Sequence, residues 1–222
     1  MKNEGILEAK EGIKMYNLEN LRKEVEKRVT KKRYIHILGV EEKAVELGKK
    51  YNLPQKDIEK LRVAAILHDV AKSMNVDELE EYCRKYFADE LTEEDIKITE
   101  ILHGFVGSYI AKKEFGIEDK SILDAIKYHT IGKKNLDLIG RIIYISDAIE
   151  KNRDYPNVDI LREKVNEDLD GGIIFEINKK SEYLKSIGGK SHRNTESMKE
   201  WLLQREEKNE QRERTGIIKG NI

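Results

Sequence analysis

The chain has 222 residues, of which 38% are charged and 38% hydrophobic, with only two prolines, and this composition favours a soluble helical protein. Its 42 Lys and Arg nearly balance its 43 Asp and Glu, so nonspecific attraction to nucleic acid is not expected. The single cysteine, Cys83, excludes an intrachain disulfide and a cysteine-based zinc finger and fits a reducing compartment. No apolar run approaches the roughly 18 residues of a membrane span, and no signal-peptide core is seen, so we expect a cytoplasmic protein without a membrane partner.

Apolar residues at helical spacing predict the first helices. Residues 1–17 carry little pattern and are expected to form an N-terminal extension, in which Met15 could be an alternative start. A helix is predicted over residues 18–29 and a second from about Thr30, ending before Pro54. One face of the second helix should carry His36, Val40, Ala44 and Leu47.

The next helix should start just after Pro54, with Asp57 as its cap, and should end in a His-Asp dipeptide, His68 and Asp69. Apolar spacing places His68 on the buried face, and Asp69 follows it into the core. A buried carboxylate beside an imidazole costs several kcal/mol unless a positive group lies opposite. A divalent metal ion is the most economical partner, although one His-Asp dipeptide alone carries little weight.

Two more helices with a buried histidine are predicted, after a helix that begins at Asn75 or Asp77 and runs through residue 87. The first follows residues 92–94 and places His103 on its apolar face. The second opens at Asp119 or Ser121 and places His129 on its apolar side.

The remaining helices are predicted over residues 138–152, 160–169 and 171–187, and around Trp201. Asp147 lies on the apolar stripe of the first of these, and Gly171 and Gly172 should interrupt the next two. A loop of residues 188–195 should precede the last helix. Since no strand alternation or internal repeat is seen, we predict one all-α domain over residues 18–204 and a charged tail over 205–222.

Four of the five histidines thus fall on apolar faces of four different helices, namely His36, His68, His103 and His129. Any one of them alone is better explained as a core histidine bonded to backbone. If these four histidines, Asp69 and Asp147 served no common purpose, each would be a separate buried polar group with its own cost of burial. Convergence on one metal site removes those separate costs and is therefore favoured.

The ligand types indicate the class of metal. Imidazoles and carboxylates without thiolates suit iron, manganese, zinc or cobalt with open positions for water. Two histidines and two aspartates leave a six-coordinate ion two vacant positions, which is typical of a hydrolytic centre. His103 and His129 could complete a second metal position or donate hydrogen bonds to phosphate oxygens, and the sequence leaves both open.

The order His36, His68-Asp69, Asp147 resembles the HD-domain metal phosphohydrolase superfamily. Residues 61–72, the His-Thr-x-Gly phrase at 129–132 and the Asp-x-Ile-Glu-x-x-Arg phrase ending at Arg153 resemble the YqeK-type branch. The resemblance covers roughly residues 18–203. It implies an HD-domain helical bundle with a metal site in its core cleft. It also implies a symmetrical bis(5'-nucleosyl)-tetraphosphatase that cleaves diadenosine tetraphosphate to two ADP using bound iron, with Mn, Co or Zn as alternatives.

Carried over by position, the metal ligands would be His36, His68, Asp69 and Asp147. Asp69, His103 and His129 would be catalytic. Asp69 would accept a proton from metal-bound water, and a protonated His103 or His129 could stabilise the ADP leaving group. The resemblance, together with the position of Lys72 one turn after His68, gives the substrate-binding set as His36, Asp69, Lys72, His103, His129, Thr130, Asp147, Arg153, Lys190, Ser191, His192, Arg193, Asn194 and Thr195.

Several alternatives accompany this interpretation. Lys72 could be a solvated surface lysine, and Arg153 could form a helix-end salt bridge with Asp154 or Asp159. The family commonly has Ala before the metal Asp and a His-Pro-x-Thr phrase near the C-terminus, where this chain has Ser146 and residues 192–195.

Other functions also stay open. These are another nucleotide phosphohydrolase, such as a deoxynucleotide 5'-phosphatase or a cyclic-nucleotide phosphodiesterase, and a noncatalytic nucleotide sensor or ribosome-associated partner. Tyr82, Tyr86 and Phe87 could be the interface of a homodimer or part of the core.

Overall fold

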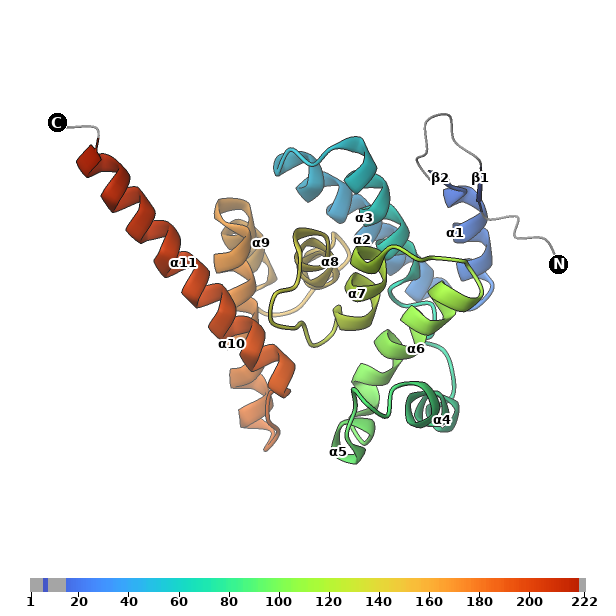
Figure 1. Cartoon of the computed structure of the whole chain (residues 1–222). Coiled ribbons are helices and arrows are strands. Elements are labelled where there is room, and N and C mark those ends of the chain that lie inside the picture. Colours follow the sequence, from blue (N-terminus) through green and yellow to red (C-terminus); the bar gives the residue numbers. More distant parts are fainter. Residues whose placement is uncertain (1–5, 8–14, 220–222) are drawn as a thin grey trace. The chain divides into compact units, whose positions relative to one another are not determined.

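The computed structural model describes residues 6–7 and 15–219 (Figure 1). The predicted all-α class is confirmed. The one addition among these residues is a two-residue antiparallel pair, β1 (Ile6–Leu7) with β2 (Met15–Tyr16). The rest of the predicted N-terminal extension lies outside the described residues. The helices are α1 (Leu18–Glu26), α2 (Lys31–Lys50), α3 (Gln55–Leu67), α4 (Val76–Tyr86), α5 (Glu93–Ile96), α6 (Thr99–Lys113), α7 (Lys120–Tyr128), α8 (Leu138–Ile149), α9 (Val158–Glu167), α10 (Leu169–Ser186) and α11 (Arg193–Lys219).

The chain divides into two compact units. The first comprises Met1–Thr130 and Leu136–Asp154, and the second comprises Ile131–Asn135 and Tyr155–Ile222. The predicted boundaries of one domain over 18–204 stay a prediction. Helix α11 continues to Lys219, beyond the residue at which the charged tail was predicted to begin.

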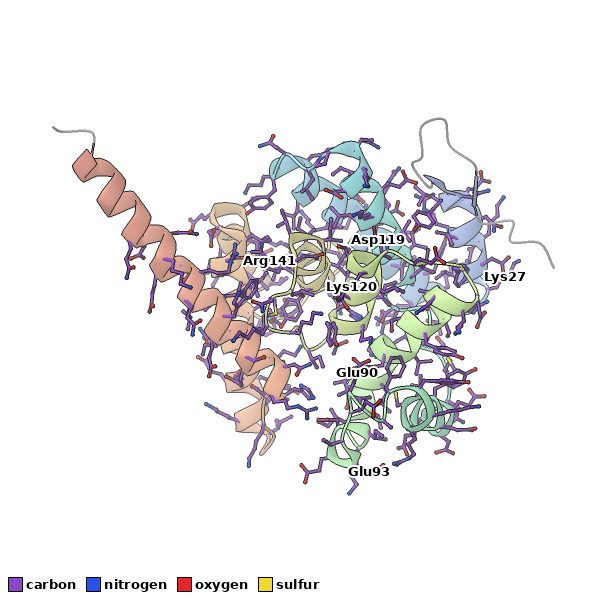
Figure 2. All side chains as sticks on the ribbon, in the orientation of Figure 1. Lys27, Glu90, Glu93, Asp119, Lys120 and Arg141 are labelled. Carbon is purple, nitrogen blue, oxygen red and sulfur yellow. The ribbon has the colours of Figure 1, made fainter. Side chains whose placement is uncertain are left out.

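The core of the first unit is built on α3 and α8. Every residue of α3 from Val63 to Leu67 is buried, and so are most residues of α8. A helix that is apolar all round must be enclosed by other helices. Accordingly α3 packs against α2, α7 and α8, while α6 packs against α4 and α7 (Figure 1). Charged side chains such as Lys27, Glu93 and Lys120 are exposed (Figure 2).

The second unit consists of α9 on α10 and α10 on α11, together with the short segment at residues 131–135. Gly132 has φ +64, and a Cβ there would lie 2.1 Å from Met198 Sδ, so glycine is required for this close approach. The Thr195 hydroxyl donates a hydrogen bond of 2.8 Å to the carbonyl of Ile131.

Several predicted helix starts are confirmed. The side chains of Thr30, Asn75 and Asp119 accept hydrogen bonds from the first-turn backbone of α2, α4 and α7. The cap predicted for α3 was wrong. Pro54 is its N-cap, no side chain caps it, and Asp57 lies inside the first turn.

Three predicted boundaries also need correction. The helix after residues 92–94 is two helices, because α5 ends at Ile96 and α6 starts at Thr99. Helix α8 ends at Ile149, since Glu150 has an extended ψ of 157. The break between α9 and α10 is Asp168, whose carboxylate caps α10, rather than Gly171 and Gly172.

The predicted loop before the last helix is shorter than expected. Helix α11 begins at Arg193, so Arg193, Asn194 and Thr195 are helical. None of the described helices is long and apolar enough to cross a membrane.

Candidate metal centre

The first unit brings six of the predicted site residues together from five helices. His36 lies in the second turn of α2, His103 in α6, and Asp147 near the end of α8. His68 and His129 are the C-cap residues of α3 and α7, and Asp69 follows His68. All of them are buried except Asp147, which is partly exposed. Termination of two helices at a histidine is what aims both rings into the core.

Short contacts link the four predicted metal ligands. His36 Nε2 is 3.0 Å from Asp147 Oδ1 and 3.7 Å from Asp69 Oδ2, and His68 Nε2 is 3.3 Å from Asp69 Oδ2. Two overlapping groups have ligand atoms within 4.8 Å of one another: His36, His68 and Asp147; and His68, Asp69 and His129. This arrangement has the spacing needed to hold one or two metal ions.

Hydrogen bonds behind three of the rings fix their tautomers. His68 donates from Nδ1 to the Ala65 carbonyl at 2.7 Å, and His129 donates from Nδ1 to the Ile126 carbonyl at 2.7 Å. His36 donates from Nδ1 to Glu150 Oε1 at 3.2 Å. Because these oxygens can only accept, each Nδ1 carries the proton and each Nε2 keeps a lone pair, as in metal-bound histidines.

Two of these inward nitrogens are otherwise unsatisfied. His36 Nε2 and His68 Nε2 are buried and make no hydrogen bond, although carboxylate oxygens lie beside them. A buried acceptor without a donor is costly. A cation between the lone pairs and the carboxylates would satisfy both, so the residues present fit a bound divalent metal.

His103 has the opposite tautomer. Lys72 Nζ, 3.3 Å away, donates to His103 Nδ1. The proton of the neutral ring is therefore on Nε2, which lies 3.1 Å from Asp69 Oδ1 and 3.0 Å from His129 Nε2. His103 presents an N–H donor to the site, where His36, His68 and His129 present lone pairs.

Burial and charge shift the pKa values of the cluster in opposite directions. Burial alone would raise the pKa of Asp69, but His68 and the other imidazoles hold it well below its usual range. Burial lowers the pKa of His68, yet the neighbouring Asp69 carboxylate outweighs burial and the net shift is upward. Burial also lowers the pKa of His103, and burial with the nearby His103 and His68 lowers that of His129 to about 3. His103 and His129 are therefore neutral near pH 7.

Each candidate carboxylate ligand is also paired with an arginine. Arg33 Nη1 lies 2.8 Å from Asp69 Oδ2. Arg153 Nη2 lies 2.5 Å from Asp147 Oδ1, and Arg153 Nε donates to the Asp147 carbonyl at 2.7 Å. Arg153 was predicted from the sequence. Arg33 was missed, although it lies one turn before His36 on the same helix.

Glu150 is a second residue whose role was missed. It is 1% exposed, accepts from His36 Nδ1, and accepts from the backbone and side-chain nitrogens of Asn152. A Cβ at Gly39 would lie 2.2 Å from Glu150 Oε2, which explains why glycine occurs beside His36. Glu150 therefore orients His36 from behind.

The remaining predicted residues divide between the two units. Thr130 donates to His129 Nε2 at 3.1 Å and so belongs to the cluster. Residues 190–195 belong to the second unit, where Ser191 Oγ lies 2.6 Å from Ser181 Oγ and the Asn194 N–H donates to His192 Nδ1. Arg193 and Thr195 lie in the first turn of α11, while Lys190 is exposed. The substrate-binding roles of this group stay predictions.

The fold and the cluster define a class that the comparisons identify: residues 33–152 match the HD domain family. The chain is 39% identical over 152 residues to "Bis(5'-nucleosyl)-tetraphosphatase, symmetrical" of Halalkalibacterium halodurans, covering 68% of this chain and 78% of the relative. It is 36% identical over 151 residues to the protein of the same name from Bacillus subtilis, covering 68% and 78%. For that of Staphylococcus aureus, the values are 34% over 167 residues, 74% and 83%.

A solved structure agrees with these relatives. A protein of Clostridium acetobutylicum described as a "predicted HD superfamily hydrolase involved in NAD metabolism" has a TM-score of 0.80 and 36% identity. The match covers 86% of this chain and 99% of that one. The chain therefore belongs to the HD-domain family, in the branch that includes the symmetrical bis(5'-nucleosyl)-tetraphosphatases.

Proposed function

We propose that the chain hydrolyses diadenosine tetraphosphate symmetrically to two ADP. The observation that carries this proposal is the cluster in which three imidazole lone pairs and two carboxylates meet the N–H of His103. The names of three relatives, each covered over more than three quarters of its length, support the substrate. They do not favour a deoxynucleotide 5'-phosphatase, a phosphodiesterase or a noncatalytic sensor.

His36, His68, Asp69 and Asp147 would hold the divalent metal ion, which we propose to be iron, with manganese, cobalt or zinc as alternatives. When bound, the ion supplies a water of lowered pKa and polarises a phosphoryl oxygen. The ion would also balance the charge of Asp69 and Asp147, the two carboxylates that raise the pKa of His68 in its absence. His129 would belong to the ligands only in a dinuclear centre.

The side chains of the cluster then have separate tasks. Asp69 accepts a proton from the attacking water, whose oxygen bonds to one of the two central phosphorus atoms. The bridging oxygen between the central phosphates leaves with the other ADP. The Nε2–H of His103 donates to a phosphoryl oxygen, and this needs no protonated imidazole because the proton is already on Nε2.

Cationic side chains neutralise the polyphosphate. Arg153, which is paired with Asp147 here, could offer a two-pronged contact to non-bridging phosphate oxygens of the substrate. Lys72 holds the tautomer of His103 and adds a positive charge behind it. Thr130 and residues 190–195 are proposed as further contacts to the nucleoside diphosphate.

A nucleotide panel tests the proposal. Purified protein loaded with Fe(II) or Mn(II) is incubated with diadenosine tetraphosphate, cyclic nucleotides and deoxynucleoside monophosphates, and products are separated by anion exchange. We expect two ADP from the tetraphosphate and little turnover of the others. Formation of AMP and ATP, or preferred turnover of a monophosphate, would overturn the proposal, and so would the absence of turnover with every nucleotide.

We also propose a cytoplasmic protein that can form a homodimer. Of the three aromatic residues singled out, Phe87 is buried against Phe105, whereas Tyr86 is 42% exposed and stacks on Tyr109. The exposed Tyr86 ring, stacked on the half-buried Tyr109, supports an interface rather than core. Light scattering of the purified chain would measure its mass, and a monomer at all concentrations would exclude the dimer.

A further inference from the structure

A pocket of about 550 Å³ opens beside His36, at the start of α2. Its lining includes Lys31, Lys32, Arg33 and His36 from α2 and Arg153 from beyond α8. All of the lining residues belong to the first unit. The pocket therefore adjoins the metal centre on the His36 side.

The order of the imidazole rings defines two ends of the cluster. Ring centroids lie 5.5 Å apart from His36 to His68, 4.9 Å from His68 to His129, and 4.9 Å from His129 to His103. The proposed phosphate donors His103 and Thr130 lie at the His103 end of the cluster. The pocket is lined by His36, at the opposite end, and by none of the other three rings.

The pocket carries an excess of positive charge. Four lining side chains are cationic, and the one carboxylate in the lining, Glu150, is already bonded to His36 and Asn152. Arg33 and Arg153 reach from the pocket wall to Asp69 and Asp147, so positive charge extends from the pocket to the candidate ligands. No ion pair with Lys31 or Lys32 is found among the residues that the structure describes, and both are exposed.

The helix itself adds to this field. The first turn of α2 contains no acidic residue and has three consecutive basic residues at the positive end of the helix dipole. Such an arrangement is unfavourable unless an anion is close. His36 belongs to the same lining, so the pocket reaches the ring whose Nε2 lies 3.0 Å from Asp147 Oδ1 in the candidate metal centre. Ile35, 47% exposed, provides an apolar edge for a base or ribose.

We propose that this pocket binds the second nucleotide half of the dinucleoside tetraphosphate. This inference rests on the proposed function, because a symmetrical cut requires two phosphates on each side of the metal centre. The donors at the His103 end account for one half of the substrate. Lys31, Lys32 and Arg33 contact the phosphates of the other half, which leaves as ADP.

The test compares a whole substrate mimic with one half of it. The double variant Lys31→Glu/Lys32→Glu is loaded with metal, and calorimetry measures binding of ADP and of diadenosine tetraphosphate with a methylene group between its central phosphates. We expect the dissociation constant of the analogue to rise about tenfold or more, since two charge-assisted contacts are lost. The affinity for ADP at the His103 end of the cluster and the metal content should be unchanged.

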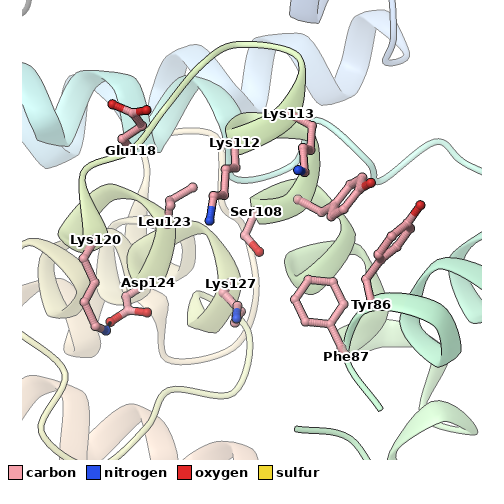
Figure 3. A pocket seen from close by; sticks show the side chains of 11 residues that line it. Tyr86, Phe87, Ser108, Lys112, Lys113, Glu118, Lys120, Leu123, Asp124 and Lys127 are labelled. Atoms are coloured by element: carbon pink, nitrogen blue, oxygen red, sulfur yellow. Dashed lines mark hydrogen bonds and ion pairs between the residues drawn. The ribbon is translucent and has the colours of Figure 1, made fainter. Parts of the chain in front are cut away.

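A second lysine-rich pocket supplies the matched control. It has a volume of about 530 Å³ and is lined by Lys112, Lys113, Lys120 and Lys127 beside Tyr86 (Figure 3). Lys112 and Lys113 are consecutive, exposed and in the same unit, as Lys31 and Lys32 are. Lys112→Glu/Lys113→Glu makes the same charge change and should leave the affinity for both ligands as it was.

The outcomes separate this inference from the proposed function. An equal loss of analogue affinity in both double variants would show a general charge effect and overturn the pocket. Normal analogue binding by Lys31→Glu/Lys32→Glu in a protein that still forms two ADP would overturn the pocket alone. Selective loss of analogue affinity in a protein that cleaves nothing would support the pocket and remove the proposed function.

Discussion

The two ends of the histidine cluster differ in which ring nitrogen carries the proton. At one end His36 and His68 turn bare Nε2 atoms towards carboxylates, and His129 has the same tautomer. At the other end His103 turns an N–H inward, because Lys72 donates to its outer nitrogen. The group behind each ring therefore decides whether the histidine can bind a metal ion or donate to a phosphate.

The positions of the histidines relative to helix ends account for this difference in tautomer. His68 and His129 both follow the last helical residue and bond to the carbonyl three residues earlier, at Ala65 and Ile126. Carbonyls in the last turn of a helix lack an intrahelical donor, so they are available for this bond. His103 lies within α6, where its outer nitrogen meets a lysine instead.

The largest effect is expected at the lone-pair end. His68→Ala and Asp69→Ala should each remove bound metal and abolish hydrolysis, since each deletes a predicted ligand at the centre of the cluster. Circular dichroism should show helical content largely intact. Elemental analysis and turnover measured on the same sample check this, and full activity in metal-free protein would refute a hydrolytic metal.

The donor end should behave differently. His103→Ala should retain most of the metal and lose turnover by about 10²- to 10⁴-fold, because it removes a donor and leaves the lone pairs in place. Metal content and turnover are again measured together. Loss of metal in parallel with activity would show that His103 is a ligand, and the contrast between the two ends would no longer hold.

The sequence was sufficient to predict which residues form this cluster, but not which groups contact them. Apolar periodicity placed His36, His68 and His129 on buried faces, because burial of a helix face follows directly from spacing. The tautomers depend on which groups lie behind the rings, and Glu150 is 114 positions from His36. Contacts at such separations are set by packing of whole helices, which periodicity does not specify.

Helix boundaries show the same limit on a local scale. Thr30 was predicted as the approximate start of α2, and Asn75, with Asp77 as the alternative, as the start of α4; in both cases the residue type itself makes the capping bond. The early end of α8 accompanies the long-range bond of Glu150 to His36, and it was missed. Helix α5, which has a local capping box of Thr92 and Asp95, was missed as a separate helix. Arg33 was missed because an arginine near a helix start is usually solvated, and only its approach to Asp69 distinguishes it.

The bond behind His36 offers an intermediate test of the lone-pair end. Glu150→Ala should weaken metal binding by about 10- to 100-fold, because His36 loses the acceptor that orients its ring. Glu150→Gln is the matched control, since its amide oxygen can still accept from Nδ1, and it should remain closer to the original affinity. Metal titration measures both, and equal losses would mean that charge rather than orientation is what Glu150 supplies.

The smallest effect is expected outside the unit that holds the histidine cluster, at Lys190. This residue is exposed and precedes α11 in the second unit. If it contacts the diphosphate as predicted, Lys190→Ala should raise the dissociation constant of ADP by up to about fivefold, since an exposed ion pair contributes at most about 1 kcal/mol. The metal content should not change, because none of the predicted ligands lies in that unit.

Lys185→Ala, at another exposed lysine a few positions earlier, is the control and should leave ADP binding as it was. An unchanged ADP affinity in Lys190→Ala would remove Lys190 from the site. An equal rise in both variants would show that Lys190 acts only through long-range charge. Higher ionic strength should then abolish the effect in both variants.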